Sequence, residues 1–348
     1  MKTSPYPGVK HSLSAMRING FGRTGRQVLR TTMGKYPGKL EVVAINTRSD
    51  VKTSAHLFKY DTNYGVYPGV VEAHEGALSV DGHRIIAFAE SSPEQIPWSE
   101  AGVDVVVEST GFFTDAASAS GHLKGGAKKV IISAPATGED ITIVLGVNEE
   151  LYRPAEHTIL SNASCTTNCI APMAKVLQDS FGIKHGLMST VHAYTNDQQI
   201  LDKSHKDLRR ARAAAQNIIP TSTGAAKLVG MIMPELAGRI HGLAFRVPVS
   251  TVSATDFVAE LDRPTSVDEV NAAFQKAARG SMNGILDYTE EPLVSSDFKG
   301  NPHSCIIDGL TTIVLDRTMV KVIGWYDNEW GYATRISDFA ALIADKGL

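Results

Sequence analysis

The sequence is poor in cysteine and has no long apolar run. Its 348 residues include 3 cysteines, too few for a disulfide framework, which predicts free thiols in a reducing compartment. A membrane-spanning helix needs about 18 or more consecutive apolar residues, and no such run is present. Residues 1–15 also lack the apolar stretch of a secretory signal. We therefore expect a loose N-terminal extension there, no membrane partner and a cytoplasmic location.

The sequence also lacks a strong charge of either sign. Its formal net charge is −3, with neither a basic field for nucleic acid nor an acidic tail. We therefore expect no nucleic-acid partner. Two cysteines lie four residues apart, but no further cysteine or histidine cluster with zinc spacing accompanies them, so no metal is predicted.

The chain is long enough for two domains of roughly 150–200 residues each. Its first half alternates apolar runs with helical segments: we expect strands at 16–19, 40–45, 103–107, 129–133 and 141–144, and a helix at 27–33. Buried runs that alternate with helices are typical of a parallel sheet covered on both faces. The fold class is therefore α/β, with a Rossmann-type doubly wound parallel sheet in residues 16–164.

The second half differs from the first in its residue pattern. Residues 187–194 and 243–261 are longer stretches rich in Val, Thr, Ser and Ala, which predict larger, partly antiparallel strands. Residues 266–269 have capping-box spacing and open a predicted helix at 267–279, and residues 329–346 are again helical. We expect an α+β catalytic domain with a mostly antiparallel sheet over residues 165–328.

A glycine-rich turn follows the first predicted strand. Gly20, Gly22 and Gly25 match G-x-G-x-x-G between a strand and a helix. Such glycines allow the tight turn, the close approach of backbone to a pyrophosphate and the packing of helix on strand. A structural turn is the alternative, since 30 glycines will produce chance matches, but the strand–turn–helix context favours a dinucleotide. The predicted cofactor-binding residues here are Gly20, Phe21, Gly22, Arg23, Thr24 and Gly25.

One part of the dinucleotide pattern is missing. An acidic residue should end the second strand and hold the adenosine ribose hydroxyls. Thr47 stands there instead, and the neighbouring Arg48 could pair with a 2′-phosphate. The alternative is that Asp50 performs the acidic role from slightly further along the chain.

A polar segment contains the candidate nucleophile. Cys165 follows an apolar strand, precedes an apolar helical run, and is surrounded by Ser, Thr and Asn. The N-terminus of a helix stabilises the reactive thiolate. Cys169 and Cys305 are better interpreted as structural. A thiol needs a base, and His192, on a predicted strand beside small hydroxyl residues, is one of 11 candidate histidines.

The segment 161–169 (SNASCTTNC) resembles the signature of phosphorylating glyceraldehyde-3-phosphate dehydrogenases. The resemblance continues in family order from about residue 16 to the end of the chain. It includes the blocks at 19–26, 56–61, 207–212, 220–227, 245–248 and 325–332. It singles out His192 as the base, and it implies reversible conversion of D-glyceraldehyde 3-phosphate and inorganic phosphate to 1,3-bisphosphoglycerate, in central carbon metabolism.

The resemblance also assigns roles to residues. Cys165 would form a thiohemiacetal and then a thioester, with His192 taking the proton and hydride passing to NAD or NADP. Asn328 would fix the nicotinamide carboxamide, and Arg23 with Thr24 would meet the pyrophosphate. Substrate and phosphate would be held by Thr195 and Arg246 in one pocket and by Ser164, Thr166, Thr223 and Gly224 in the other, with Arg210 also among the binding residues.

The same resemblance implies an assembly. Residues 201–212 would form a loop that reaches a neighbouring subunit's cofactor within a homotetramer, and residues 329–348 would return to the nucleotide domain. Ser204 stands where NAD-specific members usually carry proline, and NADP-using photosynthetic members carry serine. With Thr47 in place of the usual aspartate, this predicts dual cofactor use or a preference for NADP.

Other functions remain open at this point. Erythrose-4-phosphate dehydrogenase shares the cysteine motif but typically departs from residues 221–226 and 192–195, which this chain keeps. Acetaldehyde- or semialdehyde-type dehydrogenases share the chemistry but not the two phosphate pockets. A nucleotide- or RNA-binding protein without activity would leave the Cys165 and His192 pair idle.

Overall fold

The computed structural model describes residues 14–102 and 104–348. Of the predicted extension at 1–15, residues 1–13 lie outside the described residues, while Ser14 and Ala15 begin the first strand. Val103, which opened a predicted strand, also lies outside them. Within these two described ranges, no helix has the length and apolar composition needed to cross a bilayer.

The first half of the chain builds a nine-stranded sheet in the order β10-β11-β9-β8-β1-β2-β7-β6-β5. Strand β1 pairs in parallel with both β2 and β8, so the strand order reverses beside β1, where ligands of such sheets bind. The strands are β1 Ser14–Asn19, β2 Leu40–Asn46, β5 Val71–His74, β6 Ala77–Val80, β7 His83–Phe88, β8 Val105–Glu108, β9 Lys129–Ile132, β10 Ile141–Thr142 and β11 Ile159–Ser161; β3 Tyr60–Asp61 and β4 Gly65–Val66 form a separate pair.

The predicted Rossmann-type sheet is confirmed, with one difference at its edge. Strands β5, β6 and β7 pair antiparallel with one another, whereas every other pair in this sheet is parallel. The β6–β7 turn is Asp81-Gly82, with φ of 51° and 82°. Positive φ at both central residues is typical of a two-residue hairpin turn, for which Asp-Gly is a common sequence.

Short helices connect these strands. Helix α1 (Arg23–Lys35) begins four residues before the predicted segment and ends two residues after it. The others are α2 (Val51–Lys59), α3 (Ala116–Ala119) and α4 (Gly121–Lys124), together with the 3-10 turn η2 (Trp98–Ala101).

The second half builds an eight-stranded sheet in the order β13-β14-β12-β15-β19-β17-β16, with β18 paired to β19. Its pairs are antiparallel except β12 with β14 and β16 with β17, so the mostly antiparallel prediction is confirmed. Its strands are β12 Ile183–Ala193, β13 Ile219–Ser222, β14 Ile240–Val247, β15 Ser253–Leu261, β16 Leu286–Thr289, β17 Cys305–Asp308, β18 Ile313–Leu315 and β19 Met319–Tyr326.

The predicted stretch 243–261 is therefore two strands, β14 and β15, instead of one. The break follows Pro248, which has no N–H for a sheet ladder, and includes Val252 at a φ of 70°. The predicted stretch 187–194 is the end of β12, which begins at Ile183.

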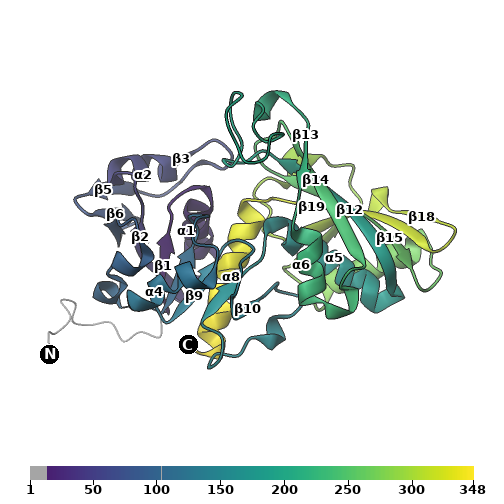
Figure 1. The fold of residues 1–348 in the computed structure, drawn as a ribbon, viewed down its shortest axis with the longest axis horizontal. Helices are drawn as coiled ribbons and strands as arrows, with labels where there is room; N and C mark the ends of the chain where they lie inside the picture. The colour runs from purple at the N-terminus through teal and green to yellow at the C-terminus, as the bar shows by residue number, and fades with distance from the viewer. Residues whose placement is uncertain (1–13, 103) are drawn as a thin grey trace.

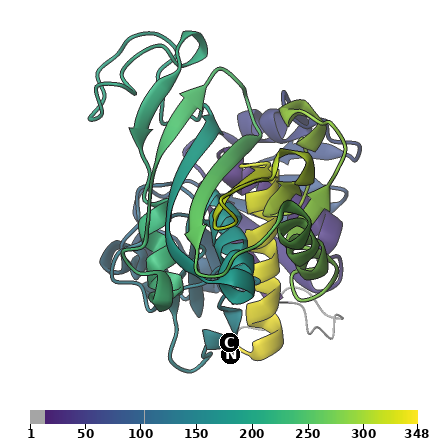
Figure 2. The same cartoon turned by 90° about the vertical axis from the view of Figure 1, so that its right-hand side faces the viewer.

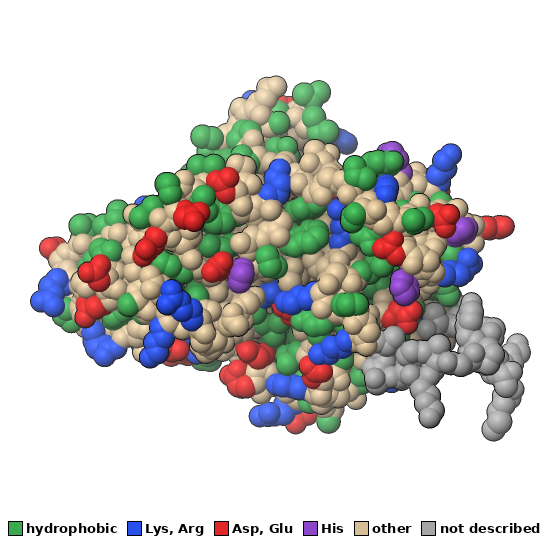
Figure 3. Space-filling view, turned by 180° about the vertical axis from the view of Figure 1, so that it is seen from behind, with side chains coloured by type: hydrophobic (Ala, Val, Ile, Leu, Met, Phe, Trp, Pro, Cys, Tyr) green, Lys and Arg blue, Asp and Glu red, His purple; other side chains and the backbone are tan. Residues whose placement is uncertain are grey.

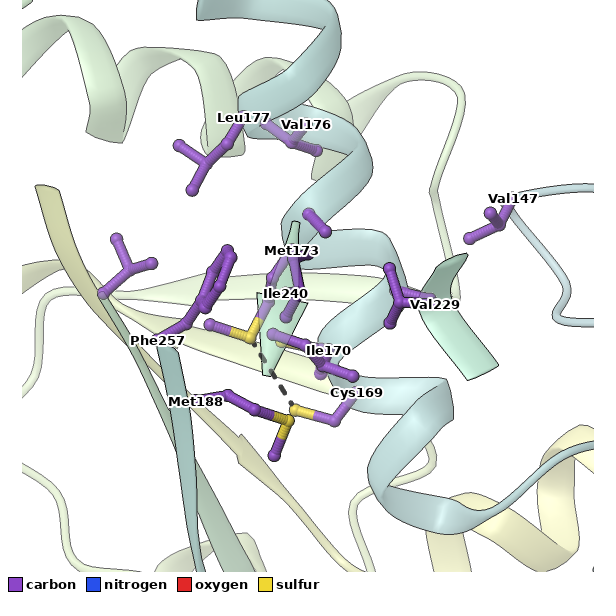
Figure 4. Close-up of a cluster of buried hydrophobic side chains, with 14 of the residues drawn as sticks. Val147, Cys169, Ile170, Met173, Val176, Leu177, Met188, Val229, Ile240 and Phe257 are labelled. Carbon is purple, nitrogen blue, oxygen red and sulfur yellow. Dashed lines mark hydrogen bonds between the residues drawn. The ribbon is translucent and has the colours of Figure 1, made fainter. Parts of the chain in front are cut away.

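Helices α5 (Cys165–Phe181), α6 (Ala225–Ile232) and α7 (Val267–Arg279) enclose a core with this second sheet. Figure 4 shows Ile170, Met173 and Leu177 of α5 among Met188, Ile240 and Phe257 of the strands. The capping box predicted for α7 is present, since Ser266 Oγ accepts from Glu269 N at 3.3 Å and Ser266 N donates to Glu269 Oε2 at 2.9 Å.

The last helix, α8 (Trp330–Lys346), packs against α1. Ser337 Oγ lies 2.9 Å from the hydroxyls of both Thr31 and Thr32, and Lys35 pairs with Asp338 at 2.8 Å. Ile336 and Phe339 belong to the first hydrophobic core. Figures 1 and 2 show α8, in yellow, between the strands of the two sheets.

Candidate active site

Helix α5 begins at Cys165, as the sequence predicts. Ser164 caps it, because its hydroxyl accepts from Thr167 N at 3.0 Å. The residue before the cap, Ala163, adopts a φ of 55°, and the hydroxyl of Tyr332 donates to its carbonyl at 2.7 Å. Left-handed backbone at a non-glycine residue is strained and needs such support, which α8 supplies directly before the nucleophile.

His192 lies near the end of β12 with its ring beside the thiol. Its Nε2 is 3.5 Å from Cys165 Sγ, and its Nδ1 is 2.6 Å from the carbonyl of Ala193. Nδ1 thus faces an acceptor, this carbonyl, and also a donor, the guanidinium of Arg246 at 2.8 Å. In the tautomer with its proton on Nδ1, Nε2 presents a lone pair to the thiol. This is the arrangement that a general base requires.

Arg246 reaches the same ring from the neighbouring strand. The register of β12 with β14 places it opposite His192. Its Nη1 lies 2.8 Å from Nδ1 of His192 and 3.1 Å from the carbonyl of Ala193. Its Nε is buried and has no hydrogen-bond partner in the described chain.

Burial and the arginine charge set the titration of this pair. Burial, and after it Arg246, lowers the pKa of His192 to about 3, which keeps the imidazole neutral. Burial raises the pKa of the Cys165 thiol, while Arg246 and hydrogen bonds with Thr166 oppose that rise. The resting pair is therefore a thiol beside a neutral imidazole that can accept its proton.

Some residues predicted to bind substrate or phosphate are already bonded to protein groups, whereas others face open space or are half-buried. Thr166 directs its hydroxyl to Tyr326 Oη at 2.9 Å, and Arg210 already contacts Thr221, Asp197 and the carbonyl of Ser222. Thr223 and Gly224 lie where α6 begins, and Gly224 has open space on its side-chain face. Thr195 is half-buried directly after β12. Their roles stay predictions.

A cleft of about 500 Å³ lies at the carboxyl ends of β1, β2 and β8. The glycine turn, Thr47, Arg48 and residues 109–110 line it. Gly20 has a φ of 93°, and a Cβ on Gly25 would lie 2.1 Å from the carbonyl oxygen of Gly20. Gly22 caps α1 without a side-chain bond and faces open space. The free N–H groups of α1 and this open cradle fit a pyrophosphate.

Two other predicted cofactor residues are held by protein partners. The guanidinium of Arg23 pairs with Asp61 at 2.6 Å and with Glu329 at 2.5 Å, so it links the fingerprint turn to the residue before α8. Asn328 is buried, and its Oδ1 accepts from Ser253 at 2.9 Å. Thr24 is half-buried in the first turn of α1. No sequence signal pointed to Asp61 or Glu329 as partners of Arg23.

The residues connected with cofactor preference are split between two places. Thr47 and Arg48 line the cleft, whereas Ser204 is exposed on the loop after β12 and is not among its lining residues. Asp50 caps α2, accepting from Thr53 N at 2.8 Å and from Thr53 Oγ1 at 2.7 Å. That bonding occupies the carboxylate which the sequence offered as an alternative ribose partner.

A larger cavity, about 990 Å³, lies away from this chemistry. It is an open groove between α5 and α7, lined by Lys175, Arg263 and Lys276 among others, and contains neither Cys165 nor His192. Volume therefore does not locate the active site, and the thiol–imidazole contact does.

Family comparison agrees with this geometry. The model of the glyceraldehyde 3-phosphate dehydrogenase NAD-binding domain matches residues 14–116, and that of the C-terminal domain matches residues 164–328. The chain belongs to the glyceraldehyde 3-phosphate dehydrogenase family. The first match spans strands β1 to β8, and the second spans every strand of the second sheet.

Curated relatives extend the likeness over nearly the whole chain. A glyceraldehyde-3-phosphate dehydrogenase of Geobacillus stearothermophilus is 58% identical over 331 residues, 95% of this chain and 98% of the relative. Glyceraldehyde-3-phosphate dehydrogenase 1 of Bacillus cereus is 57% identical over 336 residues, 97% of this chain and 100% of the relative. Glyceraldehyde-3-phosphate dehydrogenase 2 of Streptomyces avermitilis is 56% identical over 329 residues, 94% and 98% of the two chains.

Alanine substitutions at two glycines of the G-x-G-x-x-G turn should have different effects, one on the stability of the fold and the other on cofactor binding. Gly25→Ala should lower the free energy of unfolding by about 3 kcal/mol, because its Cβ overlaps backbone. Gly22→Ala should cost at most about 1 kcal/mol at this cap position, since its φ is −80°. It should nevertheless weaken NAD binding at least tenfold. Chemical denaturation and titration calorimetry measure the two effects; equal binding by Gly22→Ala and wild type would contradict the cradle.

Arg246 should control the titration of Cys165. Its charge lowers the pKa of both Cys165 and His192, so Arg246→Gln should raise both. The midpoint of the pH profile for alkylation of Cys165 by iodoacetamide should move upward by about 1 unit. Arg209→Gln, at an exposed arginine of the loop after β12, is the matched control. A midpoint that stays in place or falls in Arg246→Gln would exclude this electrostatic role.

Proposed function

We propose that the protein is a phosphorylating glyceraldehyde-3-phosphate dehydrogenase. It would oxidise the aldehyde of glyceraldehyde 3-phosphate reversibly and transfer the acyl group to inorganic phosphate. The observation that carries the proposal is the 3.5 Å contact of Cys165 Sγ with Nε2 of His192 at the start of α5. A nucleophile and base so placed suit covalent aldehyde oxidation.

The residues divide the chemistry between them. Sγ of Cys165 attacks the aldehyde carbon, and Nε2 of His192 takes the thiol proton and passes it to the carbonyl oxygen, which becomes the hydroxyl of a thiohemiacetal. When bound, NAD or NADP supplies the hydride acceptor. His192 then accepts the hydroxyl proton as the thiohemiacetal becomes a thioester. Inorganic phosphate attacks the thioester carbon, the C–S bond breaks, and the acyl phosphate leaves Cys165 as a thiolate.

Anion donors around the thiol support two phosphate pockets. The guanidinium of Arg246 contacts His192 through Nη1 and, with Thr195, would take the substrate's phosphate. Ser164 at the start of α5, with Thr223 and Gly224 at the start of α6, would take the attacking phosphate. Thr166 would contribute its backbone, since its hydroxyl is bonded to Tyr326.

We also propose use of both NAD and NADP. Thr47 carries no charge to repel a 2′-phosphate, and Arg48 is exposed at the rim of the same cleft. A carboxylate there would exclude that phosphate by like-charge repulsion. Ser204 would add its hydroxyl from a second copy of the chain.

The exposed apolar residues support assembly as a homotetramer. Leu187 and Val191 of β12 and Leu243 of β14 are 66%, 41% and 41% exposed on the sheet face opposite the α5–α7 helices. Ile200 and Leu208 of the following loop are 86% and 83% exposed. Apolar side chains gather on the upper projection in Figure 3. Exposed apolar side chains on one sheet face favour its burial in an interface.

The remaining divisions of the chain are proposed on the same basis. The nucleotide domain would comprise residues 16–164 and the returning helix at 329–348, and the catalytic domain residues 165–328. The three free cysteines fit a reducing compartment, so we propose a cytoplasmic location.

Reduction of NAD followed by absorbance tests the proposed reaction. Glyceraldehyde 3-phosphate should give sustained turnover only with inorganic phosphate, and without phosphate a single burst should accumulate the thioester. Cys165→Ser should abolish both, whereas Cys169→Ser should retain phosphate-dependent turnover, because Cys169 is buried in the core. Turnover that is independent of phosphate, or of Cys165, would refute the proposal.

The same assay with NADP tests cofactor use. Wild type should have a kcat/KM for NADP within about tenfold of that for NAD. Thr47→Asp should reduce kcat/KM for NADP by a further factor of about 10 or more, with little change for NAD, because like charges in contact cost over about 1.4 kcal/mol. Thr47→Asn is the uncharged control. Strict NAD use by the wild-type protein would contradict dual use.

A further inference from the structure

A buried carboxylate lies directly beneath the dinucleotide cleft and has no role in the chemistry above. Glu108 ends β8 and is 2% exposed. Its Oε1 accepts from the backbone N–H of Thr110 at 2.8 Å and from the hydroxyl of the same residue. Its Oε2 accepts from Asn19 at 2.5 Å and lies 3.0 Å from His122 Nε2. All four acceptor positions of the carboxylate are thus used.

The direction of every bond around Glu108 follows from its neighbours. The indole N–H of Trp98 can only donate, and it lies 3.0 Å from His122 Nδ1. His122 therefore carries its proton on Nε2 and donates it to Glu108. Because the carboxylate only accepts, Asn19 must turn its amide nitrogen toward Glu108, which leaves Asn19 Oδ1 as an acceptor.

The chain of bonds continues along the strand ends. Asn19 Oδ1 accepts from Asn46 Nδ2 at 2.8 Å. Asn46 in turn bonds to the backbone of Glu90, through its Oδ1 to the N–H and through its Nδ2 to the carbonyl, both at 2.9 Å. These side chains end β1 and β2, and the Glu90 backbone follows β7. The donors therefore point toward Glu108 from both sides, from Trp98 through His122 and from Asn46 through Asn19, and we call these bonds the Glu108 series.

These hydrogen bonds hold the residues that form the floor of the cleft. Asn19, Asn46, Glu90 and Thr110 all line it, whereas Glu108 and His122 lie beneath. Thr110 N is also the atom nearest to where a Cβ on Gly20 would lie, at 2.7 Å, so the loops after β1 and β8 are in close contact. Any shift of Thr110 or Asn19 would displace the glycine turn.

The negative charge of Glu108 so close to the dinucleotide cleft is unfavourable unless it has a structural role. The cleft is expected to hold an anionic pyrophosphate, and a buried negative charge nearby disfavours such a ligand. Among residues 14–102 and 104–348, no lysine or arginine pairs with Glu108, and His122, neutral while Nδ1 accepts from Trp98, contributes a hydrogen bond only. A carboxylate offers four acceptor positions, whereas the isosteric glutamine must present two N–H groups to donors. The geometry therefore favours a carboxylate here, because its four acceptor positions hold the loops after β1 and β8.

We propose that Glu108 is a positioning residue for the dinucleotide: it holds the loops after β1, β2 and β8 in the binding conformation before the cofactor arrives. The inference rests on the proposed function only for the identity of the ligand. A cleft ordered in advance binds more tightly because less freedom is lost on binding. Glu108 touches neither the thiol nor the base, so its loss should change cofactor affinity and leave the chemical step intact.

Glu108→Gln tests this, with Ser337→Ala as a matched control. Ser337 is another fully buried polar residue of the same half, bonded to Thr31 and Thr32 and not part of the cleft lining. Glu108→Gln should raise the Kd of NAD, measured by titration calorimetry, about tenfold. The reason is that the NH₂ group of the glutamine would face N–H or O–H groups that now donate to the carboxylate. Its kcat at saturating NAD should stay within about twofold of wild type. Ser337→Ala should lower the Tm and leave the Kd unchanged.

A double substitution that exchanges the donor and the acceptor between residues 19 and 108 should restore part of the NAD affinity. Asn19→Asp with Glu108→Gln exchanges donor and acceptor across their contact and keeps the net charge, so it should recover part of the lost affinity. A Kd for Glu108→Gln within twofold of wild type would overturn the proposal, as would an equal rise in Ser337→Ala. If Glu108→Gln does not fold, Trp98→Phe, which removes one donor at the end of the series, should raise the Kd about threefold; no rise would overturn it.

The binding experiment separates this inference from the proposed reaction. Wild-type protein that binds NAD but has no phosphate-dependent turnover would refute the proposed function, while the comparison of Kd values among the variants would still decide the role of Glu108.

Discussion

The active site depends on the strand register that places His192 opposite Arg246 on parallel strands β12 and β14. That pairing directs the imidazole toward the start of α5 and puts the arginine charge against its far nitrogen. A slip of β14 by one residue would turn Arg246 to the opposite face of the sheet, where Leu187 and Val191 are exposed, and would separate it from His192. The thiol, its base and the anion donor are therefore established together by one backbone pairing.

The two halves of the molecule are connected at the site by charge as well as by packing. Arg23, at the start of α1, holds carboxylates from β3 and from the residue before α8. Asp61 is itself buried and also accepts from Gln27 and from the backbone of Asn63 and Tyr64. Removing one partner would leave the others buried without compensation, which is the costly way to break such a network. The cofactor turn is thereby tied to the segment that includes Asn328.

Local signals in the sequence were sufficient for much of this site. The start of α5 at Cys165, the capping box at Ser266 and the glycine turn after β1 each depend on neighbouring residues, and each was predictable. The hairpin at Asp81-Gly82 also had a recognisable turn sequence, although an all-parallel sheet was expected. Partners far apart in the chain left no such signal: Arg23 and Glu329 are 306 residues apart, and Glu108 and Asn19 are 89 apart. Their pairing follows from the packing of whole elements.

The return of α8 to the first sheet has a consequence for biosynthesis. Helix α8 supplies Ile336 and Phe339 to the core that β1 and α1 begin, and Tyr332 of the same helix supports the backbone at Ala163. On a ribosome that adds about 5–20 residues per second, the first sheet waits on the order of ten seconds for this helix. The second sheet and its helices, by contrast, come from one continuous stretch of chain. The nucleotide-binding half thus stays open along α1 until the last residues leave the exit tunnel.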